Sequence, residues 1–151
     1  MKPDLPTRMM QLALSEARAA AVEGEVPVGA VVYKADGTVL ARAHNRVEAT
    51  RTPTAHAEFV AALEALKVGD DMYLTDCTVA VTLEPCAMCA AALAALRVKA
   101  IYFGAYDPKS GGTEHGAQVL KHSHHKPHVV GGLLEVECAE VLKAFFKDKR
   151  D

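Results

Sequence analysis

Two short segments far apart in the chain carry residue types that bind transition metals. The first reads His56-Ala57-Glu58, and the second contains Cys86 and Cys89, with residues 59–85 separating Glu58 from Cys86. One imidazole and two thiolates form a soft ligand set that suits zinc. A fold that uses this set must bring both segments to one ion, and this is the strongest constraint that the sequence places on the tertiary structure.

Both segments are expected at helix starts. Hydrophobic spacing predicts one helix over residues 55–68, beginning near His56, and an alanine-rich helix over 86–96 with both cysteines in its first turn. Residues at positions i and i+3 share a helix face, so both thiols can reach one ion. Pro85 suits a helix entry, where no backbone N–H is needed, and the helix N-terminus favours thiolates.

The number of ligands bears on whether the site is catalytic. Three protein ligands leave one tetrahedral position open for water, as in catalytic zinc sites, and Glu58 is placed to carry protons there. If Cys77 or His44 supplied a fourth ligand, the site would be closed and structural, and an isolated C-x-x-C is also compatible with redox chemistry. The carboxylate favours the catalytic interpretation, because a structural site does not need it.

The composition limits other function classes. The chain has 151 residues, half of them hydrophobic and 24% charged, and we expect one globular domain over residues 1–151. A net charge of −2 argues against a broad basic surface for general nucleic-acid binding, although a local basic patch is compatible with it. The N-terminus lacks a signal peptide's apolar stretch, and the longest apolar run, residues 87–96, is too short to cross a membrane. We therefore expect a cytoplasmic protein with no membrane partner.

Alternating strand and helix patterns predict an α/β fold. The expected helices cover residues 7–23, 55–68, 86–96 and 137–149, with Thr7 as the first N-cap. The expected strands cover residues 28–33, 38–43, 77–83 and 99–104. Residues 45–54 and 107–127 are expected to be loops, with a short helix near 117–121. Strands that alternate with helices indicate a three-layer α/β/α domain.

Further segments accompany the metal-binding pair over about residues 7–150. They are Glu25-Val-Pro-Val-Gly-Ala30, Asn45-Arg46, Thr82-Leu-Glu-Pro85, Gly104-Ala-Tyr-Asp-Pro-Lys109 and Ala144-Phe-Phe-Lys-Asp-Lys-Arg150. With these segments the chain resembles the cytidine/deoxycytidylate deaminase superfamily and, more narrowly, the bacterial tRNA-specific adenosine deaminases. The resemblance implies the cytidine-deaminase-like fold, with a central mixed sheet of about five strands.

The resemblance also implies an activity. Such enzymes hydrolyse the wobble adenosine of a tRNA anticodon to inosine and release ammonia, with the base flipped out of a single-stranded loop. The implied cofactor is one Zn²⁺ per subunit, held by His56, Cys86 and Cys89, with Glu58 as the catalytic proton carrier. The implied assembly is a homodimer that binds the tRNA anticodon loop. The alternative is a deaminase of a free nucleobase, nucleoside or nucleotide (guanine, cytosine or adenosine type), which shares the metal site.

Each substrate contact that the resemblance implies has a second interpretation. Asn45 is expected to hydrogen-bond the purine, or it is a turn residue. Asp107 is expected to accept from a ribose hydroxyl, or it starts a turn with Pro108. Val28 forms an apolar wall or is a core strand residue. The remaining expected contacts are the segments around Ala57, Leu83, Glu84 and Pro85, and the aromatic pair Phe145 and Phe146, one of which belongs to the core.

Two polar clusters have no single interpretation. Five of the seven histidines lie between His115 and His128, and they form either a second metal site or a polar surface loop near the substrate. Four cations lie in or near the last turn of the final predicted helix, and they either contact tRNA phosphates or only complement the helix C-terminus. These cations are Lys143, Lys147, Lys149 and Arg150.

Overall fold

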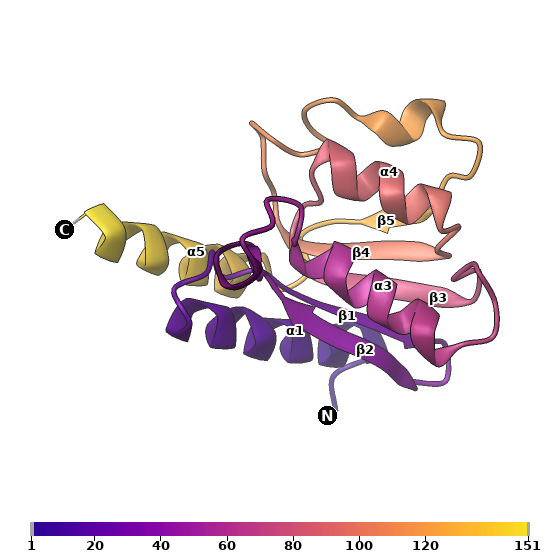
Figure 1. Ribbon diagram of the computed structural model, residues 1–151, viewed down its shortest axis with the longest axis horizontal. Coiled ribbons are helices and arrows are strands. Elements are labelled where there is room, and N and C mark those ends of the chain that lie inside the picture. Colours follow the sequence, from indigo (N-terminus) through magenta and orange to yellow (C-terminus); the bar gives the residue numbers. More distant parts are fainter. Residues whose placement is uncertain (1, 151) are drawn as a thin grey trace.

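The computed structural model describes residues 2–150, except the side chain of Arg150, and it has three layers (Figure 1). Within these residues, five strands form one mixed sheet in the order β2-β1-β3-β4-β5. β1 (Gly29–Lys34) pairs antiparallel with β2 (Val39–His44) and with β3 (Cys77–Leu83). β4 (Ala100–Ala105) pairs parallel with β3 and with β5 (His128–Val130). This confirms the expected three-layer α/β/α architecture.

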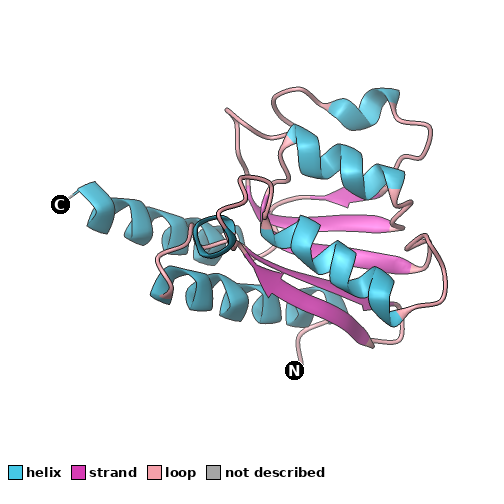
Figure 2. Cartoon of the chain, in the orientation of Figure 1, coloured by secondary structure: helices cyan, strands magenta, loops and turns pink. Residues whose placement is uncertain are grey.

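Helices cover both faces of the sheet, as Figure 2 shows by colour. α3 (Ala57–Val68) and α4 (Ala87–Ala95) pack on one face. α1 (Leu5–Val22) and α5 (Glu135–Arg150) lie on the other face, where they contact each other. The last turns of α5 extend beyond the edge of the sheet (Figure 1).

Strand β1 separates the two cores. Val31 belongs to the core under α1 and α5, together with Met10, whereas Val32 belongs to the core under α3 and α4, together with Ala61. Successive side chains of a strand point to opposite faces, so these neighbours serve different layers. Because both faces are covered, the strand is a continuous apolar run rather than an alternating one.

The first helix lies against the start of β1 with no room for a side chain. A Cβ atom at Gly29 would lie 2.0 Å from the carbonyl oxygen of Ala13. The backbone N–H of Gly29 donates to the hydroxyl of Thr82 at 3.1 Å. Glycine at this position therefore fixes how closely α1 approaches the sheet.

The predicted helix and strand boundaries are wrong at several ends. α1 begins at Leu5 with Asp4 as its N-cap, because the Asp4 carboxylate accepts from the backbone N–H of Thr7 at 3.0 Å. Thr7, the expected N-cap, therefore lies inside the helix. α5 begins at residue 135 instead of 137, and the short helix predicted over residues 117–121 is the 3₁₀ helix η1 (Val119–His122).

Two elements were not predicted. Residues 45–54, expected to be a loop, contain the one-turn helix α2 (Val47–Thr50). Strand β5 has only three residues, too few for an alternating pattern, and its pairing with β4 defines it. In the described part of the chain, the structure contains no helix with the length and apolar character to span a membrane.

Candidate functional site

The three expected metal ligands meet between the N-termini of two neighbouring helices. His56 is the N-cap of α3, Cys86 is the N-cap of α4, and Cys89 lies in the first turn of α4. Their ligand atoms all lie within 4.8 Å of one another. Neither N-cap side chain forms a capping hydrogen bond, so the His56 ring and the Cys86 thiol are free to point at a common centre.

The spacing of the ligand atoms fits a tetrahedral zinc ion. The Nδ1 atom of His56 lies 3.6 Å from the sulfur of Cys86 and 3.5 Å from the sulfur of Cys89. Zn–N and Zn–S bonds of about 2.05 and 2.3 Å at a tetrahedral angle give an N···S separation of about 3.6 Å. The donor set and its geometry therefore both suit Zn²⁺.

The electrostatics of the two thiols also favour a cation. Hydrogen bonds from Cys89 and His56 lower the pKa of Cys86 to about 4. The same contact with Cys86, together with burial, raises the pKa of Cys89 far above its usual value. The two adjacent sulfurs thus share one negative charge, and a dication that binds both stabilises the loss of the second proton.

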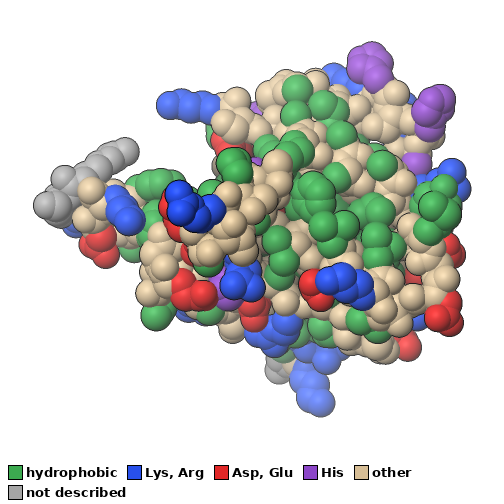
Figure 3. All heavy atoms as spheres, in the orientation of Figure 1, with side chains coloured by type: hydrophobic (Ala, Val, Ile, Leu, Met, Phe, Trp, Pro, Cys, Tyr) green, Lys and Arg blue, Asp and Glu red, His purple; other side chains and the backbone are tan. Residues whose placement is uncertain are grey.

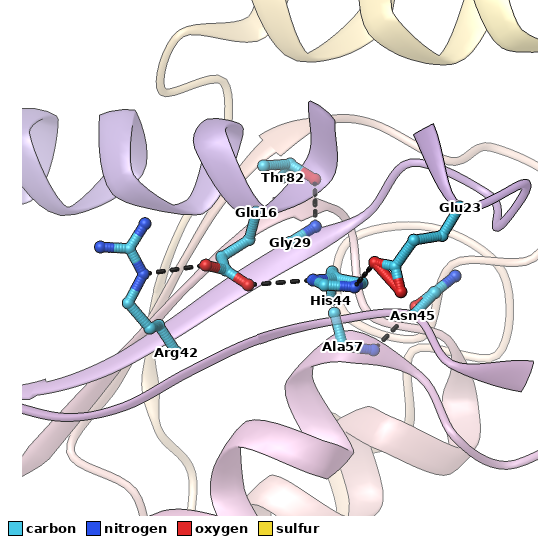
Figure 4. Close-up of polar contacts among 8 residues, drawn as sticks. All are labelled: Glu16, Glu23, Gly29, Arg42, His44, Asn45, Ala57 and Thr82. Carbon is cyan, nitrogen blue, oxygen red and sulfur yellow. Dashed lines mark hydrogen bonds and ion pairs between the residues drawn. The ribbon is translucent and has the colours of Figure 1, made fainter. Parts of the chain in front are cut away.

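Neither residue considered as a fourth ligand reaches the cluster. The ring of His44 lies between two carboxylates, those of Glu16 in α1 and of Glu23, the C-cap of that helix (Figure 4). Nδ1 of His44 lies 3.0 Å from Glu16, and Nε2 lies 2.5 Å from Glu23. The thiol of Cys77 contacts Asp76 instead. Among residues 2–150, only His56, Cys86 and Cys89 form a group of three or more such side chains close enough to share a metal ion. One tetrahedral position therefore remains open to solvent or substrate.

Glu58 lies in the first turn of α3, two residues after His56. Its side chain is buried, with 4% of the residue exposed, and it lines the cavity beside the ligands. Burial raises the pKa of Glu58 to about 7, because the charged carboxylate is poorly solvated there. A carboxyl group with such a pKa can both accept and release a proton near neutral pH.

A cavity of about 760 Å³ opens beside the ligand cluster. This volume falls in the range of small-molecule sites and accommodates a nucleoside. His56, Cys86 and Glu58 form part of its wall. The expected contact residues that also line it are Val28, Asn45, Leu83, Glu84, Asp107, Phe145 and Phe146.

Ala57 and Pro85, the other two expected contact residues, are not among the residues that line the cavity, and both form backbone hydrogen bonds next to it. The N–H of Ala57 donates to the side-chain oxygen of Asn45 at 2.7 Å (Figure 4). The carbonyl of Pro85 accepts from the N–H of Gly112 at 2.7 Å. Glu84 also has an internal role, because its carboxylate is buried and accepts hydrogen bonds from residues 107–115.

The C-terminal helix supplies one side of the cavity. Phe145 and Phe146 pack edge to face with their ring centres 5.4 Å apart, and the ammonium of Lys149 lies 5.5 Å from the ring centre of Phe145. Both rings line the cavity. The expectation that one of the two belongs only to the core is therefore wrong. Of the four tail cations, Lys149 also lines the cavity, and the side chain of Arg150 lies outside the described residues.

A match to a family model identifies the family of this chain. Residues 4–105 match the cytidine and deoxycytidylate deaminase zinc-binding region. The chain belongs to this deaminase family. The matched residues include the three ligands and Glu58, and together with the ligand geometry they assign one Zn²⁺ to each subunit of this hydrolytic deaminase.

Individual relatives resemble the deaminase over nearly its whole length. The tRNA-specific adenosine deaminase of Agrobacterium fabrum is 44% identical over 146 residues, which cover 95% of each chain. A solved structure from studies of A-to-I editing by tRNA:A34 deaminases is 44% identical with a TM-score of 0.87, covering 90% of this chain and 99% of the other. A guanine deaminase from Nitrosomonas europaea, 23% identical with a TM-score of 0.82 over 93% of this chain and 84% of the other, shares the fold.

The histidine-rich segment of the deaminase has two histidines with defined contacts. His115 Nδ1 lies 2.9 Å from the carboxylate of Glu84, and His125 Nε2 lies 2.7 Å from the carbonyl oxygen of Val98. His122, His124 and His128 are exposed. In the part of the chain that the structure describes, no three of these side chains lie close enough to share a metal ion.

Sequence reasoning missed part of the cavity wall of the deaminase. Glu25 is buried, and its carboxylate accepts from the backbone N–H groups of Glu48 and Ala49 at 2.9 and 2.8 Å, which caps α2. In the sequence, Glu25 stood out only as the first residue of the segment Glu25–Ala30, and no role was assigned to it. The other missed wall residues are Gly24, Val26, Val47, Glu48, Pro53 and Ser110.

Proposed function

We propose that the deaminase converts the wobble adenosine of a tRNA anticodon to inosine and releases ammonia. The observation that carries this proposal is the 44% identity to a tRNA-specific adenosine deaminase across 95% of both chains. The open three-ligand site and the adjoining cavity of about 760 Å³ support it, because an extruded base fits such a cavity beside the metal.

The proposed chemistry is a hydrolysis in which Glu58 carries the protons. When bound, zinc supplies a Lewis acid that lowers the pKa of a water molecule to about 7. As the water oxygen adds to C6 of adenine, Glu58 takes a water proton and gives it to the adjacent ring nitrogen. Glu58 then transfers the second proton to the amino group, which leaves as ammonia. Adenosine and one water thus give inosine and one ammonia.

Asn45 is proposed to orient the base. Its Oδ1 atom already accepts from Ala57, and in the described part of the chain no hydrogen bond uses its amide NH₂ group. That group is therefore available to donate to a purine ring nitrogen in the cavity. The apolar side chains of Val28 and Leu83 complete the proposed base pocket.

The outer part of the cavity is proposed to bind the anticodon loop. Asp107, which lines the cavity, is proposed to accept from a ribose 2′-hydroxyl, a group that distinguishes RNA from DNA. Phe146, which is 44% exposed, presents a ring on which an unpaired base can stack, and Lys149 in the cavity wall is proposed to contact a phosphate. These contacts extend the site beyond one base, as a tRNA substrate requires.

A homodimer is proposed through the face that α3 and α4 form. Hydrophobic side chains gather over this face (Figure 3), and Leu63 and Val68 of α3 are 45% and 63% exposed. Burying such a patch against a second copy removes apolar surface from water. Light scattering should give twice the chain mass, and Leu63→Glu should reduce this to the mass of one chain.

We also propose that the protein is cytoplasmic, a location that a tRNA substrate fits.

The substrate proposal is tested with a panel. The zinc-loaded protein is incubated with an anticodon stem-loop that has adenosine at the wobble position, the same stem-loop with the adenosine elsewhere in the loop, and free adenosine, guanine and cytidine. We expect inosine only in the first. Ammonia from a free base or nucleoside, with none from the stem-loop, would overturn the proposal in favour of a free-substrate deaminase.

A further inference from the structure

The buried carboxylate of Glu84 accepts hydrogen bonds from several residues of one segment, residues 107–115. The side chain of Glu84 is fully buried, between the end of β3 and the ligand Cys86. Its Oε1 atom accepts from the N–H of Asp107 at 3.0 Å and from Nδ1 of His115 at 2.9 Å. Its Oε2 atom accepts from the Thr113 hydroxyl at 3.0 Å and from the N–H groups of Glu114 and His115 at 3.0 and 2.8 Å.

Residues 107–115 also pack against the backbone of residues 85–89, which contain Cys86 and Cys89 and are called the zinc-binding segment below. Gly112 donates to the carbonyl of Pro85, and Gly111 forms an isolated β-bridge with Cys86. A Cβ atom at Gly112 would lie 2.6 Å from the nitrogen of Ala87. The contact is therefore close enough that a shift of one segment displaces the other.

Residues 107–115 carry one wall of the cavity. Asp107 and Ser110 line it, as do Cys86 of the zinc-binding segment and Glu84 directly before that segment. The hydrogen bonds that the Glu84 carboxylate accepts thus help to set the distance between the metal ligands and the wall formed by Asp107 and Ser110, here called the Asp107 wall. The five donors lie 23 to 31 positions further along the chain, and they add to the backbone contacts of Gly111 and Gly112 with Cys86 and Pro85.

We infer that Glu84 is a positioning residue whose carboxylate holds residues 107–115 against the zinc-binding segment and so sets the affinity for the nucleotide substrate. This inference rests on the proposed function, because it assigns the Asp107 wall to substrate binding. Glu84 makes no contact with the reacting atoms in this scheme. Its loss should therefore weaken substrate binding more than the bond-breaking step.

The chemistry of the cluster requires a carboxylate. All five partners are hydrogen-bond donors, and an ionised carboxylate is the side chain that only accepts. Glutamine keeps the size of Glu84 but replaces one oxygen by an NH₂ donor. Whichever way the amide is turned, that NH₂ group faces at least one backbone N–H, which can only donate, so the segment must move to relieve the mismatch.

The test uses the zinc-loaded protein and the anticodon stem-loop with a wobble adenosine. For Glu84→Gln we expect KM to rise roughly tenfold, kcat to change by less than about threefold, and zinc to remain bound. Hydrogen exchange should become faster at the backbone amides of Asp107, Glu114 and His115, which donate to the carboxylate. Unchanged KM, or a loss of kcat at unchanged KM, would overturn the inference.

A second pair of variants keeps the test decisive if Glu84→Gln does not fold. Thr113→Val keeps the shape of a buried side chain but removes one donor to Glu84, whereas Thr113→Ser keeps the hydroxyl. We expect Thr113→Val to raise KM several-fold and Thr113→Ser to recover most of that loss. Equal KM values for both variants and the wild type would overturn the inference. An inactive wild-type protein on the stem-loop would instead overturn the proposed function, and the exchange measurement would still test the role of Glu84 in holding the segment.

Discussion

The side-chain oxygen of Asn45 accepts a 2.7 Å hydrogen bond from the backbone N–H of Ala57, the residue between the ligand His56 and the proton carrier Glu58. Asn45 follows the last residue of β2, and Ala57 is the first residue of α3. The bond therefore ties the sheet to the helix start that presents the catalytic residues. It also leaves the amide NH₂ of Asn45 as a donor toward the cavity.

Substitutions of Asn45 separate these two roles. Asn45→Ala loses the acceptor for a buried N–H group, and we expect unfolding free energy to fall by about 1–3 kcal/mol along with activity. Asn45→Asp keeps the acceptor and loses the NH₂ donor, so stability should stay within about 1 kcal/mol of the wild type while KM rises. Urea denaturation and steady-state kinetics measure both. Equal kinetics for Asn45→Asp and the wild type would show that the amide does not contact the base.

Glu58 is expected to be essential for turnover and dispensable for the fold. Glu58→Ala and Glu58→Gln should retain zinc and the circular dichroism spectrum, but lose deamination by about 10²–10⁴-fold, because both remove the buried carboxyl group beside the ligands that is proposed to carry the protons. Glu64→Gln, on the exposed side of the same helix, serves as the control and should remain active. Turnover in Glu58→Gln comparable to that of the control would contradict the proposed mechanism.

Removal of zinc is expected to abolish activity and reduce stability. Cys86→Ser and Cys89→Ser should each lose bound zinc, measured by atomic absorption, whereas Cys77→Ala should retain one ion per chain. Zinc at 100 times its dissociation constant stabilises the folded state by about 2.7 kcal/mol, so a chelator should lower the unfolding midpoint of the wild type. A Cys86→Ser protein that keeps stoichiometric zinc would contradict the ligand assignment.

The lowered pKa of Glu16 predicts that this residue makes a pH-dependent contribution to stability. Burial acts to raise the pKa of Glu16, but contacts with His44 and Arg42 outweigh it and hold the pKa below its usual value. A carboxyl with a lowered folded-state pKa stabilises the fold above its unfolded pKa of about 4.3, and this contribution is lost as pH falls through the folded-state value.

The matching experiment compares Glu16→Gln with the wild type by urea denaturation between pH 3 and pH 7. We expect the variant to be less stable by about 0.5–1 kcal/mol at pH 7, with the difference shrinking below pH ~4. Glu64→Gln, which removes an exposed carboxylate, should show a smaller difference at pH 7. A difference for Glu16→Gln that grows as the pH falls would have the wrong sign for a carboxyl held in its charged form.

Much of the fold could be predicted from local patterns. The strand over residues 77–83 was predicted with the bounds that the structure shows, because it is rich in apolar and β-branched residues and ends just before the segment that contains Cys86 and Cys89. The N-cap of α1 was wrong because Asp4 and Thr7 are both good caps, and only the hydrogen bond between them decides which one acts. β5 has too few residues for a periodic signal, so only its partner β4 identifies it.

The sequence by itself determined the chemistry of this protein, because residue type and i, i+3 spacing at helix starts are local properties. His56, Glu58, Cys86 and Cys89 could be recognised for that reason. The tertiary structure alone decided the shape of the site. The contacts of Glu84 with residues 107–115 span 23 to 31 positions, and Phe145 reaches the cavity because the last turns of α5 extend beyond the sheet. Such long-range contacts depend on strand order and layer packing, which no short segment of sequence specifies.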